Sequence, residues 1–197
     1  INVAGQNIEI EIRGMNAFTF ILIIAVILQV IFFIPSFLLK TEKYYDIVGS
    51  LTYIITISIA YFSVENKTMI DSIIYFYVMV WASRLGIYLF RRVRNDGKDI
   101  RFEKAKRHFF WFLQYWMGQA LWVSLTACAA IIAILSPEDN TLPVFAIIGM
   151  ALWLSGFAIE SVSDYQKRVF RKENNPSESF IHTGLWARSR HPNYFGE

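Results

Sequence analysis

Residues 17–39 read AFTFILIIAVILQVIFFIPSFLL, a run of 23 amino acids without a charged side chain. An α-helix rises 1.5 Å per residue, so about 20 apolar residues are enough to cross the hydrocarbon core of a bilayer. The run is too long for the apolar core of a secretory signal peptide, and no small-residue cleavage pattern follows it. It therefore predicts a transmembrane helix.

Four further stretches predict membrane spans for the same reason, near residues 47–64, 70–90, 109–135 and 143–164. Pro143 suits the first turn of the last span, because a proline there costs no helical hydrogen bond. The preceding residues 136–140, Ser-Pro-Glu-Asp-Asn, are typical of a tight turn. Beyond residue 159 the pattern continues as a polar helix toward Arg171. The sequence thus predicts an all-α fold, a polytopic transmembrane bundle with about five spans.

Composition supports this interpretation. Hydrophobic residues make up 55% of the chain and charged residues only 18%, whereas soluble domains carry about 25% charged residues. Six Trp, ten Tyr and seventeen Phe residues suit a chain that contacts lipid and its interfaces. Cys128 is the only cysteine, which excludes an intramolecular disulfide.

Basic residues are concentrated on one side of the five spans. Sixteen of the nineteen follow the first, third or fifth span, namely Lys40, Lys43, Arg91, Arg92, Arg94, Lys98, Arg101, Lys104, Lys106, Arg107, Lys167, Arg168, Arg171, Lys172, Arg188 and Arg190. Cytoplasmic loops carry such an excess, so the pattern predicts a cytoplasmic location for these segments and an external N-terminus. Residues 91–107 suit either anionic lipid headgroups or an anionic cofactor. We expect no nucleic acid, because this segment lies between two spans.

Residues 1–16 do not fit the membrane pattern. Residues 8–12, Ile-Glu-Ile-Glu-Ile, alternate like a short strand. The segment is interpreted either as a natural extramembrane part or as residues added ahead of a natural start at Met15. Residues 17–197 are expected to form a single membrane domain.

Several common sites are not readable in the sequence. It has neither Gly-x-Gly-x-x-Gly nor a Gly-rich phosphate loop, which argues against Rossmann and P-loop nucleotide sites. His108, His182 and His191 show no metal-ligand spacing, so no metal site is expected. A Gly-x-Ser-x-Gly nucleophile elbow is also missing.

Polar residues within or beside the spans are candidates for function. Arg84 lies about 9 Å from the end of its span by helical rise, and either extends to the headgroups or turns inward to an anion or carboxylate. Gln114 and Gln119 are expected to form hydrogen bonds between helices.

A row of charged residues follows the fifth span. Glu160, Asp164, Arg168 and Arg171 recur at intervals of four, four and three, which places them along one helix face. They form either a solvated helix end or a binding surface. In the second interpretation the carboxylates accept hydrogen bonds from ribose or amide groups and the arginines bind phosphate.

The segment GLWARSRHPNYFGE, residues 184–197, combines arginines, a histidine, an amide, a phenol and a carboxylate. It resembles the signature of the steroid 5-alpha-reductase-like integral membrane family, in particular its bacterial branch DUF1295. Residues 163–171 resemble the cytoplasmic end of a central family helix. Residues 83–86, with Arg91, Arg92 and residues 99–102, resemble the third span and its loop. The resemblance covers roughly residues 70–197.

This resemblance implies a membrane reductase that uses NADPH in a cytoplasm-facing cavity and has no Rossmann domain. The reaction expected is hydride transfer to the double bond of a hydrophobic enone, steroid-like or another lipid. The bacterial inner membrane is the expected location, or the endoplasmic reticulum in a eukaryote. The cofactor-binding residues implied are Asp164, Arg171, Asn193 and Glu197, joined by Arg168 on the same helix face and by Arg190, His191 and Tyr194 in the same motif.

The catalytic acid departs from the family pattern. Steroid reductases stabilise the developing enolate with a glutamate and a tyrosine from the second and third helices. Trp81 stands at the tyrosine position here, and Glu65 is at the outer end of the second span. The remaining candidates are Tyr75, Tyr77 and Tyr88 on the third span, and the sequence does not choose among them.

Two other functions share part of the pattern. Isoprenylcysteine carboxyl methyltransferases and phospholipid methyltransferases resemble the motif through Arg-His-Pro-x-Tyr-x-Gly and bind S-adenosylmethionine, and some relatives are non-catalytic lipid-binding scaffolds. Asn193 and Glu197, together with Asp164 and Arg171, favour the reductases. The family normally continues past this motif with further helices. We therefore expect a C-terminal part beyond Glu197, and weak cofactor binding by residues 1–197 alone.

Overall fold

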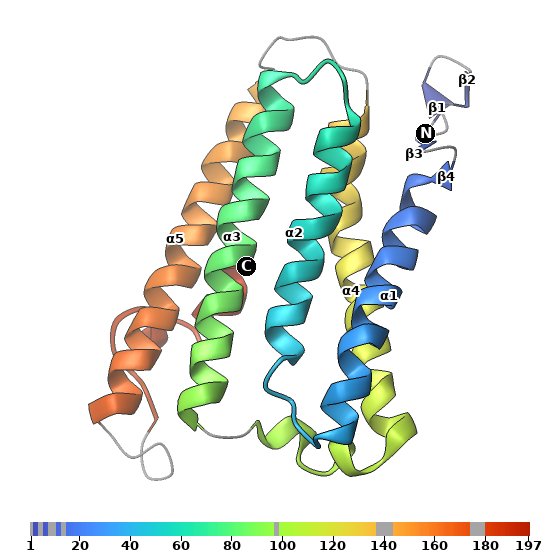
Figure 1. Ribbon diagram of the computed structural model, residues 1–197. Helices are drawn as coiled ribbons and strands as arrows, with labels where there is room; N and C mark the ends of the chain where they lie inside the picture. The colour runs from blue at the N-terminus through green and yellow to red at the C-terminus, as the bar shows by residue number, and fades with distance from the viewer. Residues whose placement is uncertain are drawn as a thin grey trace. The chain divides into compact units, whose positions relative to one another are not determined.

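The computed structural model describes residues 2–3, 6–7, 11–12, 15–96, 99–136, 144–173 and 180–197. Its long helices are α1 (Ala17–Leu38), α2 (Tyr45–Ser63), α3 (Met69–Asp96), α4 (Phe109–Leu135) and α5 (Val144–Glu173) (Figure 1). Its short elements are the strands β1 (Asn2–Val3), β2 (Gln6–Asn7), β3 (Glu11–Ile12) and β4 (Met15–Asn16), and the helices η1 (Ile100–Phe102), η2 (Ala105–Arg107), η3 (Gly184–Ala187) and α6 (Pro192–Gly196).

The all-α prediction is confirmed, and each of the five predicted spans is a helix long and apolar enough to cross a membrane. The ends of α1, α2 and α4 agree with the apolar runs to within two residues. Helix α3 continues past residue 90 and α5 continues past residue 164, because arginine, lysine and glutamate sustain a helix beyond the bilayer.

Some sequence features lie outside the described residues. The tight turn expected at 136–140 and the helix start expected at Pro143 fall on residues 137–143, which the structure does not describe. Of the alternating segment 8–12, only Glu11 and Ile12 are described, as strand β3 paired antiparallel with β4.

Side chains mark where two of the helices begin. The Asn16 side chain accepts a hydrogen bond from the Phe18 N–H (3.0 Å), which satisfies a donor in the first turn of α1. Before α3, the Thr68 N–H donates to Asp71 Oδ2 (2.8 Å) and the Asp71 N–H donates to Thr68 Oγ1 (3.1 Å). This reciprocal pair resembles a capping box and fixes the entry into α3.

The chain divides into two compact units, residues 1–140 and 141–197, here called the N-terminal and C-terminal units. In the N-terminal unit α2 packs against α3 and α4, and α1 packs against α4 and α2 (Figure 1). Most of its buried apolar residues belong to two clusters. One contains Ala17, Ile21, Ile57, Ala60, Ala127, Ile131 and Ile134, and the other Phe33, Val48, Phe102, Ala105, Phe112 and Trp116.

Inter-helix polar contacts in this unit differ from the expectation. Gln114 is exposed, and Gln119 packs against Gly49 of α2, where an added Cβ would lie 2.5 Å from its Nε2. Within the described residues, the buried Gln119 Oε1 has no hydrogen-bond partner. A different glutamine, Gln29 of α1, does bond across helices: its Nε2 donates to Thr52 Oγ1 of α2 (3.3 Å).

A buried carboxylate ties two loops together at one end of the N-terminal unit. Glu42, between α1 and α2, accepts from Lys106 Nζ at 2.7 Å and from the Asp99 N–H at 3.0 Å. Both donors belong to the connection between α3 and α4. These two hydrogen bonds hold the α1–α2 loop against the connection between α3 and α4, although the two segments are far apart in sequence.

A second group of charges lies at the same connection. Arg101 donates to both Asp99 carboxylate oxygens, with its shortest contact at 2.6 Å, and Arg92 lies 3.5 Å from Asp46. Partial burial opposes ionisation of Asp99, but the hydrogen bonds from Arg101 outweigh it and lower the pKa of Asp99. Hydrogen bonding to Asp99 likewise raises the pKa of Arg101.

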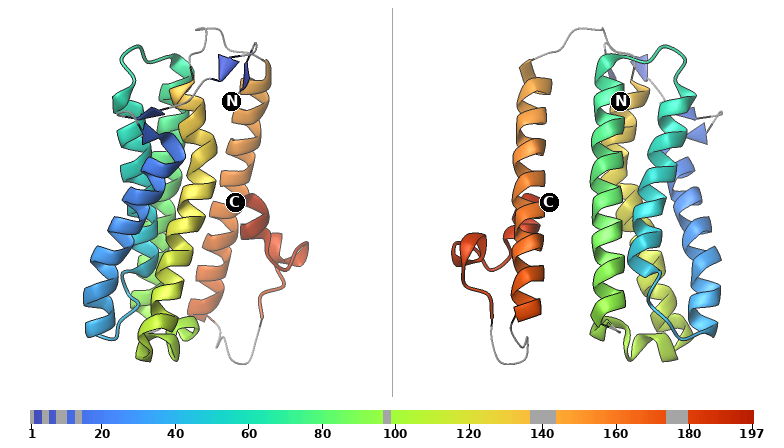
Figure 2. Two further views of the ribbon diagram at one scale, coloured as in Figure 1. Left: turned by 90° about the vertical axis from the view of Figure 1, so that its right-hand side faces the viewer. Right: turned by 60° about the vertical axis from the view of Figure 1, so that its left-hand side comes forward.

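The C-terminal unit consists of α5 and a segment, residues 180–197, that returns alongside it (Figure 2). The Leu185 N–H donates to Gln166 Oε1 (3.0 Å) and the Trp186 Nε1–H donates to the Ser163 carbonyl (3.0 Å). Gly184 has a φ of 63°, a left-handed conformation that glycine adopts without steric cost. These contacts anchor η3 to the polar end of α5.

Candidate functional site

A cavity of about 550 Å³ lies in the C-terminal unit, at the polar end of α5. Its described lining residues are Lys167, Phe170, Arg171, Phe180, Ile181, His182, Trp186, Ala187, Ser189 and Arg190. Three of these side chains are Lys or Arg, and none of the described lining residues is acidic. A cavity of this volume falls within the range of small-molecule sites, and its charge suits an anionic ligand.

The indole of Trp186 is held between a backbone acceptor and a cation. Its Nε1–H bonds to the Ser163 carbonyl, and Lys167 Nζ lies 4.7 Å from the centre of its ring. Ser163 and Lys167 are four residues apart on α5, so both face the same side of the helix. The cation–π contact and the hydrogen bond together fix the orientation of Trp186 in the cavity wall.

Two of the predicted cofactor residues meet in this cavity. Arg171 comes from the last turns of α5 and Arg190 from the returning segment, and both line the same space. Arg168 is exposed and does not belong to the lining; its guanidinium carbon lies 5.4 Å from the centre of the Tyr165 ring.

The predicted row on α5 changes from buried to exposed along the helix. Glu160 and Asp164 are buried, whereas Arg168 and Arg171 are exposed. The helix therefore combines a buried pair of carboxylates with accessible guanidinium groups at its polar end.

The other predicted residues lie on or beside α6. The rings of His191 and Tyr194 stack with centroids 5.4 Å apart, and both side chains are exposed. The Asn193 Oδ1 atom is buried and accepts no hydrogen bond within the part of the chain that is described. Glu197 is exposed, and its N–H donates to the Asn193 carbonyl (3.0 Å). None of the four is among the residues that line the cavity.

Two glycines bring α6 against α5. A Cβ on Gly156 would lie 2.5 Å from the Gly196 carbonyl oxygen. A Cβ on Gly196 would lie 2.5 Å from the Gly156 oxygen and 2.6 Å from the Glu160 nitrogen. Only glycine allows this backbone approach, which positions Asn193 and its neighbours on the helix that carries Asp164 and Arg171.

The three candidate tyrosines belong to α3, in the N-terminal unit. Tyr75 faces α2: its ring stacks on Tyr61 with centroids 4.4 Å apart, and its hydroxyl lies 3.4 Å from Ser58 Oγ. Tyr77 and Tyr88 are eleven residues apart, which places them on a common face.

That common face also contains Arg84. Its guanidinium carbon lies 5.9 Å from the centre of the Tyr88 ring, in the range of a cation–π contact. Trp81, at the position of the family tyrosine, packs edge-on against Tyr53 of α2, with ring centroids 5.0 Å apart. It has no hydroxyl, so Tyr77 and Tyr88 are the hydroxyl-bearing residues nearest to it on that face of α3.

Of the described lining residues, sequence reasoning predicted only Arg171 and Arg190; the others include three that can interact with a ligand, Lys167, His182 and Trp186. The sequence offers His182 only as a metal ligand, and among the described residues no group of three or more His, Cys, Asp or Glu could hold a metal ion. Lys167 and Trp186 lie in two of the stretches that resemble the family, residues 163–171 and 184–197. The cation–π contact between these two residues could not be predicted from sequence. They are nineteen positions apart, and the contact forms only because the chain folds back on α5.

The five apolar helices define a multi-pass membrane protein. Residues 32–197 match the family described as a protein of unknown function, DUF1295, and the chain belongs to that family. The expectation from the C-terminal motif is thereby confirmed, and the protein is a membrane protein of steroid-reductase-like type. No solved structure matches the chain.

Proposed function

We propose that this protein is an NADPH-dependent oxidoreductase that reduces a carbon–carbon double bond in a hydrophobic enone, either steroid-like or another lipid. Membership of a reductase-like family supports the class. The observation that carries the proposal is the cavity in which Arg171 of α5 and Arg190 of the returning segment come together with Lys167.

The residues present fit the chemical groups of this cofactor. NADPH carries a pyrophosphate and a further phosphate. The two guanidinium groups and one ammonium group of the cavity can donate hydrogen bonds to phosphate oxygens. The buried Asn193 Oδ1, which accepts no hydrogen bond within the described chain, can accept one from an amide or a ribose hydroxyl. When bound, the cofactor supplies the hydride.

The chain itself must stabilise negative charge that develops on the substrate oxygen. A fixed hydroxyl donor does this effectively where water is excluded. Tyr77 and Tyr88 are our first candidates, because they share a face of α3 with Arg84. Tyr75 is second, because its hydroxyl already lies beside Ser58 of α2.

The cytoplasmic side of the membrane suits this role. Lys167, Arg171 and Arg190 belong to the basic side of the chain, which the distribution of Lys and Arg assigns to the cytoplasm. NADPH is a cytoplasmic cofactor, so this orientation gives the cavity access to it. Because the resemblance is to the bacterial branch of the family, we propose the bacterial inner membrane, or the endoplasmic reticulum in a eukaryote.

The decisive experiment is ligand binding by the purified full-length protein. NADPH should raise its unfolding temperature progressively with concentration, since a ligand at 100 times its Kd stabilises a protein by about 2.7 kcal/mol. S-adenosylmethionine at the same concentrations should have no effect. A response to S-adenosylmethionine without one to NADPH would contradict the proposal and favour a methyltransferase.

Turnover distinguishes an enzyme from a scaffold. With NADPH and a panel of enone lipids, the protein should oxidise NADPH in proportion to the reduced product. Saturable NADPH binding without turnover of any panel member would leave a lipid-binding scaffold as the better explanation.

A further inference from the structure

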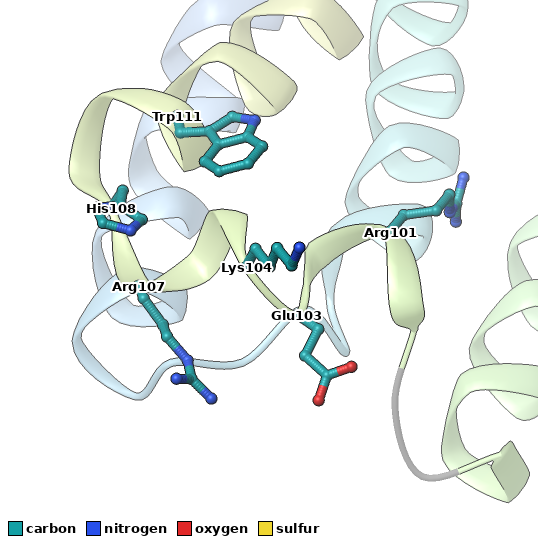
Figure 3. A pocket seen from close by; sticks show the side chains of 6 residues that line it. All are labelled: Arg101, Glu103, Lys104, Arg107, His108 and Trp111. Atoms are coloured by element: carbon teal, nitrogen blue, oxygen red, sulfur yellow. The ribbon is translucent and has the colours of Figure 1, made fainter.

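A second cavity, of about 530 Å³, lies in the N-terminal unit where the chain enters α4 (Figure 3). Its described lining residues are Arg101, Glu103, Lys104, Arg107, His108 and Trp111. All of them belong to residues 99–111. It shares no lining residue with the cavity of the C-terminal unit.

The cations of this segment fall into two groups. Arg101 and Lys106 are held by the carboxylates of Asp99 and Glu42, and the Arg101 guanidinium points away from the other lining side chains (Figure 3). Lys104 and Arg107 are exposed, and within the described residues neither side chain forms an ion pair or a hydrogen bond. These two cations are available to an external anion.

The cavity lies where the headgroups of a bilayer are expected. His108 directly precedes α4, whose residues Phe109–Leu135 are long and apolar enough to cross a membrane. The first N–H groups of a helix have no helical acceptors and carry partial positive charge, which favours an anion at this end. The site thus combines a helix N-terminus with two available cations in a cavity.

The rim of the cavity suits a lipid rather than a soluble anion. Trp111 is 46% exposed and its neighbour Phe110 is 81% exposed, and tryptophan is enriched at membrane interfaces. The end of α1 continues this apolar surface. Phe37 packs on Phe109 with ring centroids 5.2 Å apart, and Leu38 is exposed beside it. Acyl chains can lie against this strip while a headgroup occupies the cavity.

We propose that this cavity binds the phosphate of an anionic phospholipid, with Lys104 and Arg107 as its ligands and Phe110 and Trp111 against the glycerol and upper acyl chains. Glu103 also lines the cavity and limits its positive charge. The proposal is independent of the reductase function, because it uses none of the residues assigned to the cofactor.

The test is a titration of the full-length protein in lipid nanodiscs, with bound lipid counted by native mass spectrometry. Phosphatidylglycerol should bind saturably over a phosphatidylcholine background. The K104Q/R107Q variant should bind it roughly tenfold or more weakly. The matched control is K40Q/K43Q, which removes two exposed cations on the same predicted side of the membrane but outside the cavity, and should weaken binding much less than K104Q/R107Q. Equal losses in both variants would show diffuse attraction only and overturn the site.

Two further arms make the result independent of folding. The E103Q variant should bind phosphatidylglycerol several-fold more tightly, a gain that misfolding cannot produce; unchanged or weaker binding would count against the site. Glycerol phosphate at millimolar concentration should displace little lipid. Displacement at the concentrations at which lipid binds would identify a soluble anion as the ligand and overturn the lipid assignment.

Discussion

The basic segments of the two units differ in what lies beside their cations. In the N-terminal unit, the carboxylates of Glu42, Asp46 and Asp99 pair with Lys106, Arg92 and Arg101. In the C-terminal unit, the described residues that line the cavity include three Lys or Arg residues and no acidic residue. The distribution of basic residues predicts the same side of the membrane for both segments. The first group of cations joins loops through carboxylates, whereas the second group lines the cavity that we propose for the cofactor.

The largest effect should follow from breaking the loop pair. The E42A variant removes the partner of Lys106 and the acceptor of the Asp99 N–H, and loss of one member of a well-buried pair costs about 3 kcal/mol. E42Q should cost less, because its amide oxygen can still accept from the Asp99 N–H. Chemical unfolding in detergent measures both. The exposed Lys43 of the same loop provides the control, and a K43A loss as large as that of E42A would show that the pair is not the cause.

The C-terminal unit should be most sensitive at its glycine contact. In G156A the new Cβ meets the Gly196 oxygen at 2.5 Å, so α6 must shift from α5 at a cost of about 2 kcal/mol. Proteolysis within residues 180–197 should become at least tenfold faster. G149A is the matched control on the same helix, because no atom lies within 4 Å of its added Cβ. If G149A accelerated proteolysis of residues 180–197 equally, the cause would be the lower flexibility of α5 and not the contact between residue 156 and Gly196.

Substitution of the exposed Arg171 tests the proposed cofactor cavity. R171A should weaken NADPH binding about tenfold, since a charge-assisted hydrogen bond contributes about 1.5 kcal/mol or more. If Arg171 meets the additional phosphate, NADH binding should change far less. R168A controls for charge, because Arg168 is exposed but does not line the cavity. Isothermal calorimetry provides the affinities, and equal losses for both cofactors would refute contact with that phosphate.

The smallest effect should be the pH dependence of the Asp99 pair. The folded-state pKa of Asp99 lies below its ordinary value of 3.8, so its ionised form stabilises the fold above that pH. This contribution, less than about 1 kcal/mol because the pair is partly exposed, is lost as the pH falls through the lowered pKa. The difference in stability between the wild type and D99N should be constant above about pH 5 and shrink below 3.8. A difference that grows on acidification would contradict this assignment.

Sequence alone predicted the helices well because a membrane span depends on a local quantity, the length of an apolar run. The start and end of α4 follow from residues 109–135 without any knowledge of its neighbours. The extension of α3 to Asp96 was missed because leaving the bilayer does not end a helix. The end of an apolar run marks the membrane boundary, and the helix boundary is set separately.

Residues of the C-terminal cavity were predicted only where they lie in a motif that resembles the family or on a helix face that the residue spacing defines. Arg171 and Arg190 came from resembling motifs, and the structure brings them to one cavity. The pairing of Glu42 with Lys106, 64 residues apart, left no signal, because a single sequence does not show which loops meet. The approach of Gly156 to Gly196 was missed for the same reason.

Each of the two cavities contains one tryptophan, Trp111 in the N-terminal unit and Trp186 in the C-terminal unit. The emission of an indole depends on the charges beside its ring, and a cation lies 4.7 Å from the centre of Trp186. An anion that draws Lys167 away will change the emission of Trp186, while a phosphate bound by Lys104 will change that of Trp111. Difference spectra of W186F and W111F against the wild type therefore separate the two occupancies. The protein carries its own optical reporter for each basic cavity.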